Sequence, residues 1–516
     1  MIATRSTGLP GALALSSCGL VGAALALLLA AQGLDAPARQ RWCEAFCWGL
    51  LAAGLLSLIV GLVQVFLPAW ADGTFIARSG IPGRAVGNMR QPNHLASLLM
   101  WACVAAVYLA DQGRLNRLNG RKGLNGLKAS APVALPLPLL LFALVFAVVL
   151  SASRTGMVGV LVLAAWGLLD RKLQRATRWA LIATPLMLAL SWGLLAVWAG
   201  SGGGHAFGAE SRLSEEGAGS PSRLAILANA WALVKMHPLA GVGWGGFNFA
   251  WTMTPFPNRP IAFFDHTHDL PMQLAVELGL PLALLILGLL GWSLWRALRM
   301  SMRAQGGDAV ARRCTFMMVI TIGLHSLLEY PLWYAYFLLP AAFAFGLSLG
   351  RLDGADAPQR AAARDISLPL RLAGLLMIAG SAFAVWDYLR IVDIYAPKAN
   401  AASLEQRIAI GQRSPFFSAL ADYAAATSLP PGPAALAAAR RTAHNLIDVR
   451  LMMAWAKSLE ATGDVDRARY VVQRLREFRS REGADWLAEC AAFKPQERKP
   501  FQCEPPSREY RYEEMR

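Results

Sequence analysis

Apolar runs of about 20 residues recur along most of this chain and constrain its fold more than any other feature. A helix of that length crosses the hydrocarbon core of a bilayer. Only 16% of the residues are charged, against about 25% in a soluble domain. The pattern predicts an all-α, polytopic membrane helix bundle with about ten spans. The predicted spans are 12–31, 46–67, 95–110, 133–150, 154–169, 179–199, 272–295, 314–329, 332–350 and 370–388.

The positive charge of the chain lies mainly in the connections between these runs. A formal net charge of +16 is also typical of nucleic-acid-binding proteins. Here the basic residues gather on every second connection, at 114–128, 171–178, 296–313 and 351–371. Short basic loops of membrane proteins stay in the cytoplasm. We therefore expect four solvated basic loops on one cytoplasmic face and no nucleic-acid partner.

Alternation across the membrane then assigns the other connections to the outside. These are 68–94, 150–153, 200–269, the corner at 329–331 and everything after about 389. The N-terminus also falls outside, although 12–31 is too long for the core of a cleavable signal and Arg5 alone makes a weak basic region before it.

Composition divides the chain into a membrane domain, 1–388, and a polar C-terminal domain, 389–516. In the second, apolar residues at helical spacing and a break at Gly463-Asp464 predict a helical hairpin of tetratricopeptide type. The alternative is two amphipathic helices packed on the membrane domain. Cys490 and Cys503, on the predicted oxidising side, are candidates for a disulfide, with free thiols as the alternative. The other five cysteines are expected to be packed thiols.

The long outer loop at 200–269 has its own internal pattern. Residues 223–235 have helical periodicity, and His237-Pro238 ends that helix. The segment 241–247 is rich in glycine and predicts a tight turn, whose N–H groups could instead point at an anion.

Unusual polar residues gather where apolar runs meet the outer loops. Ionisable groups at membrane depth are costly and tend to serve function. The topology places all of them at the outer ends of spans. They are Gln91, Asn93, His94, Arg154, Arg223, His266, His268, Asp269, His325, Glu329 and Tyr330.

These residue types suit transfer from a lipid pyrophosphate. A guanidinium grips phosphate bidentately, which fits Arg154 and Arg223 to the leaving diphosphate. A neutral histidine can take the proton of an attacking hydroxyl, which fits His268 or His266.

Structural alternatives remain for several of these residues. Arg154 could bind a lipid headgroup, His94 could cap the third span, and His325 with Glu329 could form a structural pair. The two histidines of the loop have a zinc-like spacing, but no third ligand stands out, so no metal is expected.

Several of these motifs together resemble bacterial protein O-oligosaccharyltransferases, the pilin-glycosylating branch of the O-antigen ligase and polymerase superfamily. The His325–Phe337 run is the most distinctive, and the polar tail with its two cysteines also resembles this branch. The other matching motifs are Gln91-x-Asn93-x-Leu95, Ser153-Arg154-Thr155, Arg223, Gly243-Trp244, Phe264-x-His266-x-His268, Leu274, Glu277 and Gly279.

The resemblance implies a glycan donor on undecaprenyl pyrophosphate and a serine or threonine acceptor on pilin or another exported protein. It implies transfer at the periplasmic face of the bacterial inner membrane, without metal or other cofactor. The arginines would hold the diphosphate, and His268 first, His266 second, would be the base. Gln91, Asn93, Asp269, His325, Glu329 and Tyr330 would support the site.

The chain departs from the family in two places. The family commonly has His-Asn where this chain has His268-Asp269, and the carboxylate could orient the imidazole. The family also has more spans before Gln91, so we expect that this chain starts late.

Two other functions remain as hypotheses. The acceptor could be lipid A-core sugar or another repeat unit, as in O-antigen ligases and polymerases. A lipid or solute transporter is disfavoured, because its polar groups should line a path through the membrane, whereas here they gather on one side.

Overall fold

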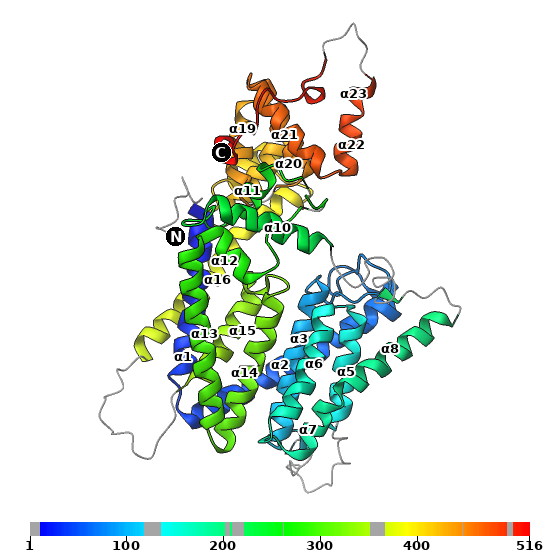
Figure 1. The fold of residues 1–516 in the computed structure, drawn as a ribbon, viewed down its shortest axis with the longest axis vertical. Coiled ribbons are helices and arrows are strands. Elements are labelled where there is room, and N and C mark those ends of the chain that lie inside the picture. The colour runs from blue at the N-terminus through cyan, green and yellow to red at the C-terminus, as the bar shows by residue number, and fades with distance from the viewer. Residues whose placement is uncertain are drawn as a thin grey trace. The chain divides into compact units, whose positions relative to one another are not determined.

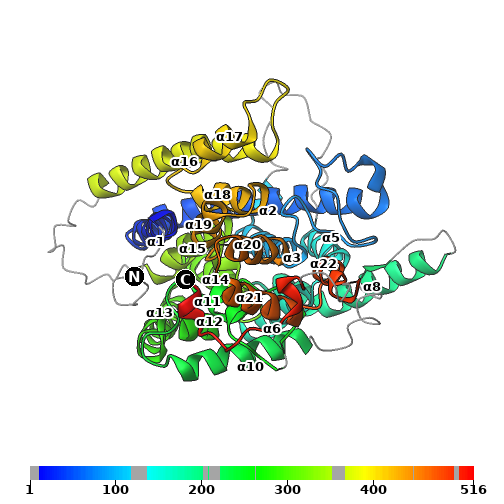
Figure 2. The same ribbon diagram turned by 90° about the horizontal axis from the view of Figure 1, so that it is seen from above.

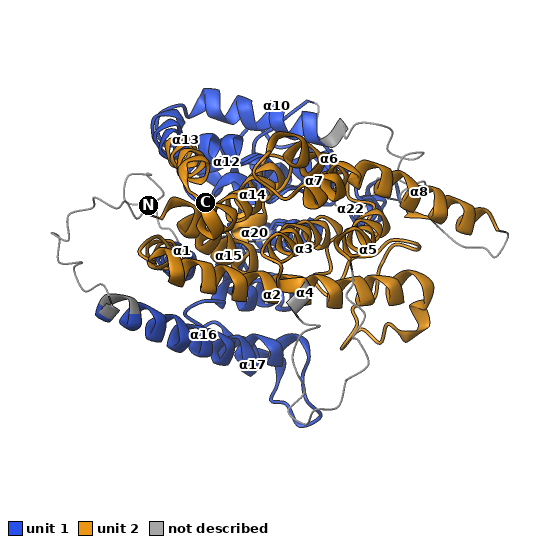
Figure 3. Ribbon diagram, turned by 90° about the horizontal axis from the view of Figure 1, so that it is seen from below, with its two compact units in different colours: residues 1–23, 220–289, 365–516 blue, residues 24–219, 290–364 orange. Residues whose placement is uncertain are grey.

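The computed structural model describes a helical protein (Figure 1). The described residues are 11–117, 136–201, 207–208, 221–257, 259–261, 263–350, 367–445, 447–492 and 499–516. Within them no β-strand occurs, which confirms the all-α class. The chain forms two compact units (Figure 3). Unit 1 comprises Met1–Ala23, Ser220–Leu289 and Asp365–Arg516, and unit 2 comprises Ala24–Gly219 and Leu290–Arg364.

Unit 2 is a bundle built around one buried helix, α3. This helix packs against α2, α5, α6 and α14. Small residues allow the close approach, because a Cβ on Gly54 would collide with Ala102 and one on Gly156 would come within 2.7 Å of Ala96. The helices of unit 2 are α2 (Ala36–Phe66), α3 (Pro92–Asp111), α4 (Arg114–Arg117), α5 (Leu137–Leu150), α6 (Arg154–Leu169), α7 (Arg175–Ile182), α8 (Thr184–Gly200), α14 (Gly306–Ser326), η2 (Pro331–Trp333) and α15 (Ala335–Leu349), with η1 (Pro68–Trp70) after α2.

Unit 1 joins the segment after α8 to the C-terminal helices. α1 (Gly11–Gln32) and α13 (Leu280–Arg303) each contribute residues to both units. The remaining helices of unit 1 are α10 (Pro221–Met236), α11 (Phe247–Met253), α12 (Leu270–Leu278), α16 (Ser367–Tyr395), α17 (Leu404–Gly411), α18 (Ser418–Ser428), α19 (Pro433–Thr442), α20 (Val449–Ala461), α21 (Val465–Glu477), α22 (Arg481–Leu487), α23 (Glu489–Ala492), η3 (Phe501–Cys503) and η4 (Tyr512–Met515).

The predicted apolar runs are all occupied by helices in their described parts. Among the described residues, five helices are long and apolar enough to cross a membrane: α1, α2, α3, α13 and α16. The pair α7 and α8, bent by 41°, makes a sixth if it counts as one span. α5, α6 and α15 are apolar but shorter. The chain is thus a multi-pass membrane protein, and the count of about ten spans stays a prediction.

The predicted span 272–295 is wrong in detail. Two helices, α12 and α13, replace it, and Gly279 separates them with a φ of +78°. A side chain there would collide with the carbonyl of Leu239. The membrane-length helix is α13, so α12 precedes the span.

The prediction of a solvated basic loop at 296–313 is also wrong for its last two arginines. α14 begins at Gly306, so Arg312 and Arg313 lie inside a helix and are buried. Asp308 accepts hydrogen bonds from Arg39 and Arg312, both at 2.6 Å, and Arg313 pairs with Asp170 at 2.7 Å. Each of these guanidinium groups pairs with a carboxylate of the protein. Arg312 pairs within its own helix, and Arg39 and Arg313 pair with a residue of another element. Much of the other basic connections, 118–135 and 351–366, lies outside the described residues.

The C-terminal helices stack on one another and share a core with α11. Helices α18 to α21 follow one another side by side (Figure 2). The predicted hairpin is present as α20 and α21, with Gly463 at a φ of +86° between them. Trp251 of α11 contacts Phe478, and Phe249 contacts Trp455, with ring centroids 5.6 and 6.0 Å apart. The loop after α8 and the tail therefore share one core, while the domain boundary at 388 and the tetratricopeptide type stay predictions.

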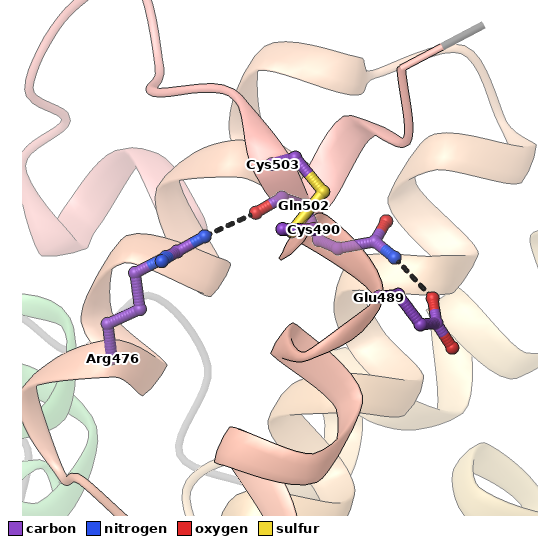
Figure 4. The surroundings of a disulfide bond; sticks show 5 residues. All are labelled: Arg476, Glu489, Cys490, Gln502 and Cys503. Carbon is purple, nitrogen blue, oxygen red and sulfur yellow. Dashed lines mark hydrogen bonds between the residues drawn. A yellow bond between two sulfur atoms is a disulfide. The ribbon is translucent and has the colours of Figure 1, made fainter. Parts of the chain in front are cut away.

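The tail contains a disulfide between Cys490 and Cys503 (Figure 4). Around it, Arg476 donates to the carbonyl of Gln502, and the Gln502 amide donates to Glu489, both at 2.8 Å. Of the remaining cysteines, Cys43, Cys47, Cys103 and Cys314 are buried as expected, whereas Cys18 is exposed on α1. The prediction of a packed thiol is wrong for Cys18, because that face of α1 is not covered by protein.

Candidate active site

The two histidines of the predicted outer loop, His266 and His268, lie in unit 1, directly before α12. They flank Thr267, which is 1% exposed. The Thr267 N–H donates to the side chain of Gln273 at 2.8 Å, and its hydroxyl donates to the carbonyl of Asp269 at 2.9 Å. The buried Thr267 thus anchors the loop to α12, while His266 and His268, on either side of it in the chain, are partly exposed.

His268 has a left-handed backbone, with a φ of +58°. This conformation costs a non-glycine residue about 1–3 kcal/mol and persists only where the surroundings hold it. Here the anchors at Thr267 and Asp269 hold it from both sides, and its ring meets the ring of Phe264 edge-on at 5.3 Å. Such strained residues gather at functional sites, which adds a structural argument to the sequence prediction for His268.

Asp269 is the N-cap of α12. Its carboxylate accepts a hydrogen bond from the N–H of Met272 at 2.7 Å. Asparagine and aspartate cap helices about equally well. Asp269, which stands where the family commonly has asparagine, therefore retains the capping role. Whether the carboxylate also orients the His268 ring stays a prediction.

The glycine-rich turn does direct N–H groups at an anion, and the anion is a side chain of the protein. Gly241, Gly243 and Gly245 have φ values of +65°, +95° and +68°. The N–H of Phe247 donates to the Glu277 carboxylate at 3.3 Å, and the N–H of Gly245 acts on the same group. The turn thus encloses Glu277 at the end of α12.

Backbone bonds fix this turn closely to α12. The N–H of Val242 donates to the carbonyl of Val276 at 2.8 Å, and that of Gly243 donates to the carbonyl of Glu277 at 3.0 Å. A Cβ on Gly241 would lie 2.5 Å from the Glu277 backbone. Both the positive φ and the close approach therefore require glycine at 241.

The carboxylates around the loop have perturbed pKa values. Burial raises the pKa of Glu277 to about 7, although the charge of His266 and the N–H groups of Gly245 and Phe247 act to lower it. Burial also acts to raise the pKa of Asp265, but the hydrogen bond and charge of His266 outweigh it and bring that pKa below its ordinary value. Asp265 Oδ1 lies 3.3 Å from His266 Nδ1. Burial raises the pKa of Asp269, against the N–H of Met272.

A second polar cluster lies in unit 2, where three helix ends meet. The amide of Asn93, in the first turn of α3, donates to Glu329 at 3.0 Å and accepts from the hydroxyl of Ser153 at 2.6 Å. Ser153 is the N-cap of α6, and Gln91 is the N-cap of α3. Asn93, Ser153 and Glu329 are all at most 6% exposed. The cluster joins the starts of α3 and α6 to the segment after α14.

The histidines of unit 2 belong to the same cluster. His325 Nδ1 lies 2.7 Å from the hydroxyl of Ser97, and His94 Nδ1 lies 2.9 Å from that of Tyr336. His325 and Glu329 thus both bond to α3, through Ser97 and Asn93, and the interpretation of the two as a structural pair stays a prediction. The interpretation of His94 as a helix cap is wrong, since Gln91 has that role. Tyr330 stacks on Tyr334 with centroids 6.0 Å apart.

Four further residues belong to these clusters but were not predicted as site residues: Ser97, Tyr336, Gln273 and Glu277. One signal existed for Ser97: it lies one helical turn after Asn93, and His325 lies the same four positions before Glu329. The two pairs match in register, but only knowledge that α3 faces α14 would make that match informative.

The arginines have the predicted local positions. Arg154 is the first residue of α6, next to Ser153, and Arg223 lies in the first turn of α10; both are partly buried. Arg154 belongs to unit 2, whereas Arg223, His266 and His268 belong to unit 1. A common pocket for all four stays a prediction. Within the described residues, no group of three or more histidine, cysteine or acidic side chains is placed to hold a metal ion.

Three family models match the chain. Residues 85–110 match the protein glycosylation ligase family, 139–287 match the O-antigen ligase family, and 314–488 match the C-terminal part of the virulence factor membrane-bound polymerase family. Every candidate residue of the two clusters lies within these segments. The disulfide cysteines lie beyond them.

Two curated relatives from Acinetobacter baylyi are similar to the chain. A general O-oligosaccharyltransferase is 26% identical over 351 residues, which are 64% of this chain and 55% of the relative. A ComP-specific O-oligosaccharyltransferase is 25% identical over 287 residues, 53% of this chain and 45% of the relative. The chain spans about half the length of these relatives. The predicted resemblance to protein O-oligosaccharyltransferases of the O-antigen ligase superfamily is confirmed.

Proposed function

We propose that this chain, which resembles the protein-glycosylating branch of the O-antigen ligase superfamily, is an oligosaccharyltransferase. It moves a glycan from undecaprenyl pyrophosphate to serine or threonine hydroxyls of an exported protein such as pilin. The reaction takes place at the periplasmic face of the inner membrane, outside the cytoplasm, where both donor and acceptor are accessible.

One observation carries the proposal. The three family matches contain both polar clusters, the histidine loop of unit 1 and the Asn93–Glu329–Ser153 network of unit 2. The segments that identify the family are thus the segments that gather ionisable groups beside apolar helices. The similarity of this chain to two O-oligosaccharyltransferases supports a protein as the acceptor.

The reaction needs only groups that the chain supplies. His268 takes the proton of the acceptor hydroxyl as its oxygen attacks the anomeric carbon of the glycan. The bond from that carbon to the diphosphate oxygen breaks, and the undecaprenyl diphosphate leaves with both electrons of the bond. Arg154 and Arg223 hold the diphosphate through charge-assisted hydrogen bonds. Arg154→Ala should therefore raise the KM for the donor.

The test is co-expression with a lipid-linked glycan pathway and a candidate pilin. Intact-mass analysis should show the pilin heavier by one glycan, and a pilin of unchanged mass in a strain that makes the donor would reject the proposal. The same cells should be examined on a lipopolysaccharide gel.

A second candidate is transfer to lipid A-core sugar or to another repeat unit. The matches to the O-antigen ligase and membrane-bound polymerase families favour it. New high-molecular-weight lipopolysaccharide bands with an unmodified pilin would establish this alternative.

A further inference from the structure

The connection between α2 and α3 displays two large aromatic side chains on its surface. Phe75 is 81% exposed and Trp70, the last residue of η1, is 69% exposed. Both belong to the segment 67–78, called here the aromatic loop, which directly follows α2. Apolar side chains that gather on a surface mark a contact with protein or with lipid. The position and the charge of the loop decide between these two partners.

Hydrogen bonds hold the aromatic loop in one conformation. One carboxylate oxygen of Asp72 accepts from the three successive N–H groups of residues 74–76, at 2.9, 2.9 and 3.0 Å. Gly73, with a φ of +87°, supplies the left-handed backbone of this turn. Phe75 is thus presented to the surroundings by an ordered backbone.

The aromatic loop folds back onto the last turn of α2. The side chain of Gln64, in that turn, donates to the carbonyl of Ala77 at 2.6 Å and accepts from the N–H of Gly87 at 2.9 Å. The side chain of Asn88 donates to the carbonyl of Phe75 at 2.8 Å and accepts from the N–H of Ala77 at 2.9 Å. Because Gln64 is buried, these bonds are shielded from water. Phe75 is therefore held close to the end of α2.

An exposed apolar face of α2 leads into the aromatic loop. This helix is long and apolar enough to cross a membrane. Leu56 and Ile59 are exposed on it, and so is Leu67 at its C-cap. With about 3.6 residues per turn, these three positions share one face of the helix. In a membrane-spanning helix such a face contacts lipid, and the aromatic loop continues it.

The charges of the connection fit a phospholipid surface. Residues 67–91 contain three arginines, Arg78, Arg84 and Arg90, and one acidic residue, Asp72, whose carboxylate caps the turn. Arg78 and Arg90 are exposed, and each donates to a backbone carbonyl of the loop. A guanidinium has five N–H donors, so it can bind a carbonyl and a phosphate at once. Aromatic rings beside cations are typical of segments that lie in the membrane interface.

We propose that the aromatic loop is a membrane anchor. Trp70 and Phe75 insert into the leaflet at which α2 ends, and Arg78 and Arg90 bind the phosphates of its lipid headgroups. Gln64 and Asn88 tie the loop to the segment that precedes α3, so the anchor also sets the depth at which α3 begins. This inference concerns a lipid surface and does not depend on the proposed function.

A nitroxide label on the aromatic loop tests the proposal. The full-length protein is purified into nanodiscs of phosphatidylethanolamine and phosphatidylglycerol. The background is Cys18→Ser, because Cys18 is exposed whereas the other free thiols are buried. The label is attached in the Phe75→Cys variant and, separately, in the Trp70→Cys variant. Electron paramagnetic resonance then compares collisions of the label with oxygen, which concentrates in lipid, and with a water-soluble nickel complex.

Two matched positions calibrate the measurement. Ile59→Cys, on the exposed face of α2, is the lipid reference, and Glu482→Cys, exposed on α22, is the water reference. At positions 70 and 75 the ratio of oxygen to nickel collisions should be several-fold higher than at position 482 and close to that at position 59. Each variant should keep the unfolding midpoint of the Cys18→Ser parent. Two loop positions keep the test decisive if one substitution disturbs folding.

Two results would overturn the proposal. A ratio at the loop positions equal to that at position 482 would place the loop in water. Few collisions with either reagent would show that protein, such as a second copy of this chain, covers the loop instead of lipid. A lipid-like ratio in a protein that transfers no glycan would support the anchor and reject only the proposed function.

Discussion

The two polar clusters are held in opposite ways. In unit 2, side chains satisfy one another across helices: Asn93 bonds both Glu329 and Ser153, and His325 meets Ser97. In unit 1, backbone N–H groups supply the bonds: that of Thr267 donates to Gln273, that of Met272 donates to the cap Asp269, and that of Phe247 in the glycine turn donates to Glu277 of α12. In unit 2 the polar side chains are engaged with one another and form a rigid frame. In unit 1 the backbone supplies the hydrogen bonds, which leaves the imidazoles of the loop partly exposed for reaction.

The largest effect should follow from removing the reactive group of unit 1. His268→Ala should lower glycan transfer by about 10²–10⁴-fold, because a positioned base contributes that much. Intact mass of the co-expressed acceptor measures it. His444→Ala, in the turn after α19, is the control variant and should transfer normally. Normal transfer by the His268→Ala variant would contradict the assignment of the reactive group to the cluster of unit 1.

The next effect should be on the stability of unit 2. Asn93→Ala leaves Glu329 and Ser153 without their amide partner in a buried site, which costs about 1–3 kcal/mol per unsatisfied group. The midpoint of thermal unfolding in detergent should fall accordingly. In a double-mutant cycle with Glu329→Ala, the double variant should lose less unfolding free energy than the two single variants lose together. Strict additivity of the two losses would show that the cluster is not a coupled network.

A smaller effect should appear as pH dependence in unit 1. Glu277 has a folded-state pKa of about 7, raised by burial from an ordinary 4.5. Between these values the unfolded chain loses the proton first, so the contribution of Glu277 to stability is full below about pH 4.5 and is lost as the pH rises to about 7. Glu277→Gln should flatten the decline of the unfolding midpoint between pH 5 and pH 8, and an unchanged decline would contradict the burial of this carboxyl.

The smallest effect should come from the cap of α12. Asp269→Asn retains a side-chain oxygen for the N–H of Met272, so stability and transfer should stay close to wild type. Asp269→Ala should lower stability by about 1 kcal/mol. Loss of transfer in the stable Asn variant would mean that the negative charge, and not the cap, matters at this position.

Local features of this protein were predictable from the sequence. The helix at α10, its end at His237-Pro238, the glycine turn and the hairpin of α20 and α21 all match the prediction. Each depends on a pattern within a few turns of chain: apolar spacing, proline, or glycine at a positive φ. The motif residues of the candidate site were found in the same way, through their positions at the ends of apolar runs.

Only the tertiary structure decided which polar groups meet. Arg312 and Arg313 were expected in a solvated loop, but both are buried in α14. Arg312 pairs with Asp308 of the same helix, and Arg313 pairs with Asp170, the residue that follows α6. Glu277 became part of the site because the glycine turn donates N–H groups to it, one of them from Phe247, 30 positions earlier in the chain. Hydropathy and local spacing determine that helices form and where they stop, since both depend on neighbours along the chain. Partners of buried charges depend on which faces pack together, and that is set by the whole fold.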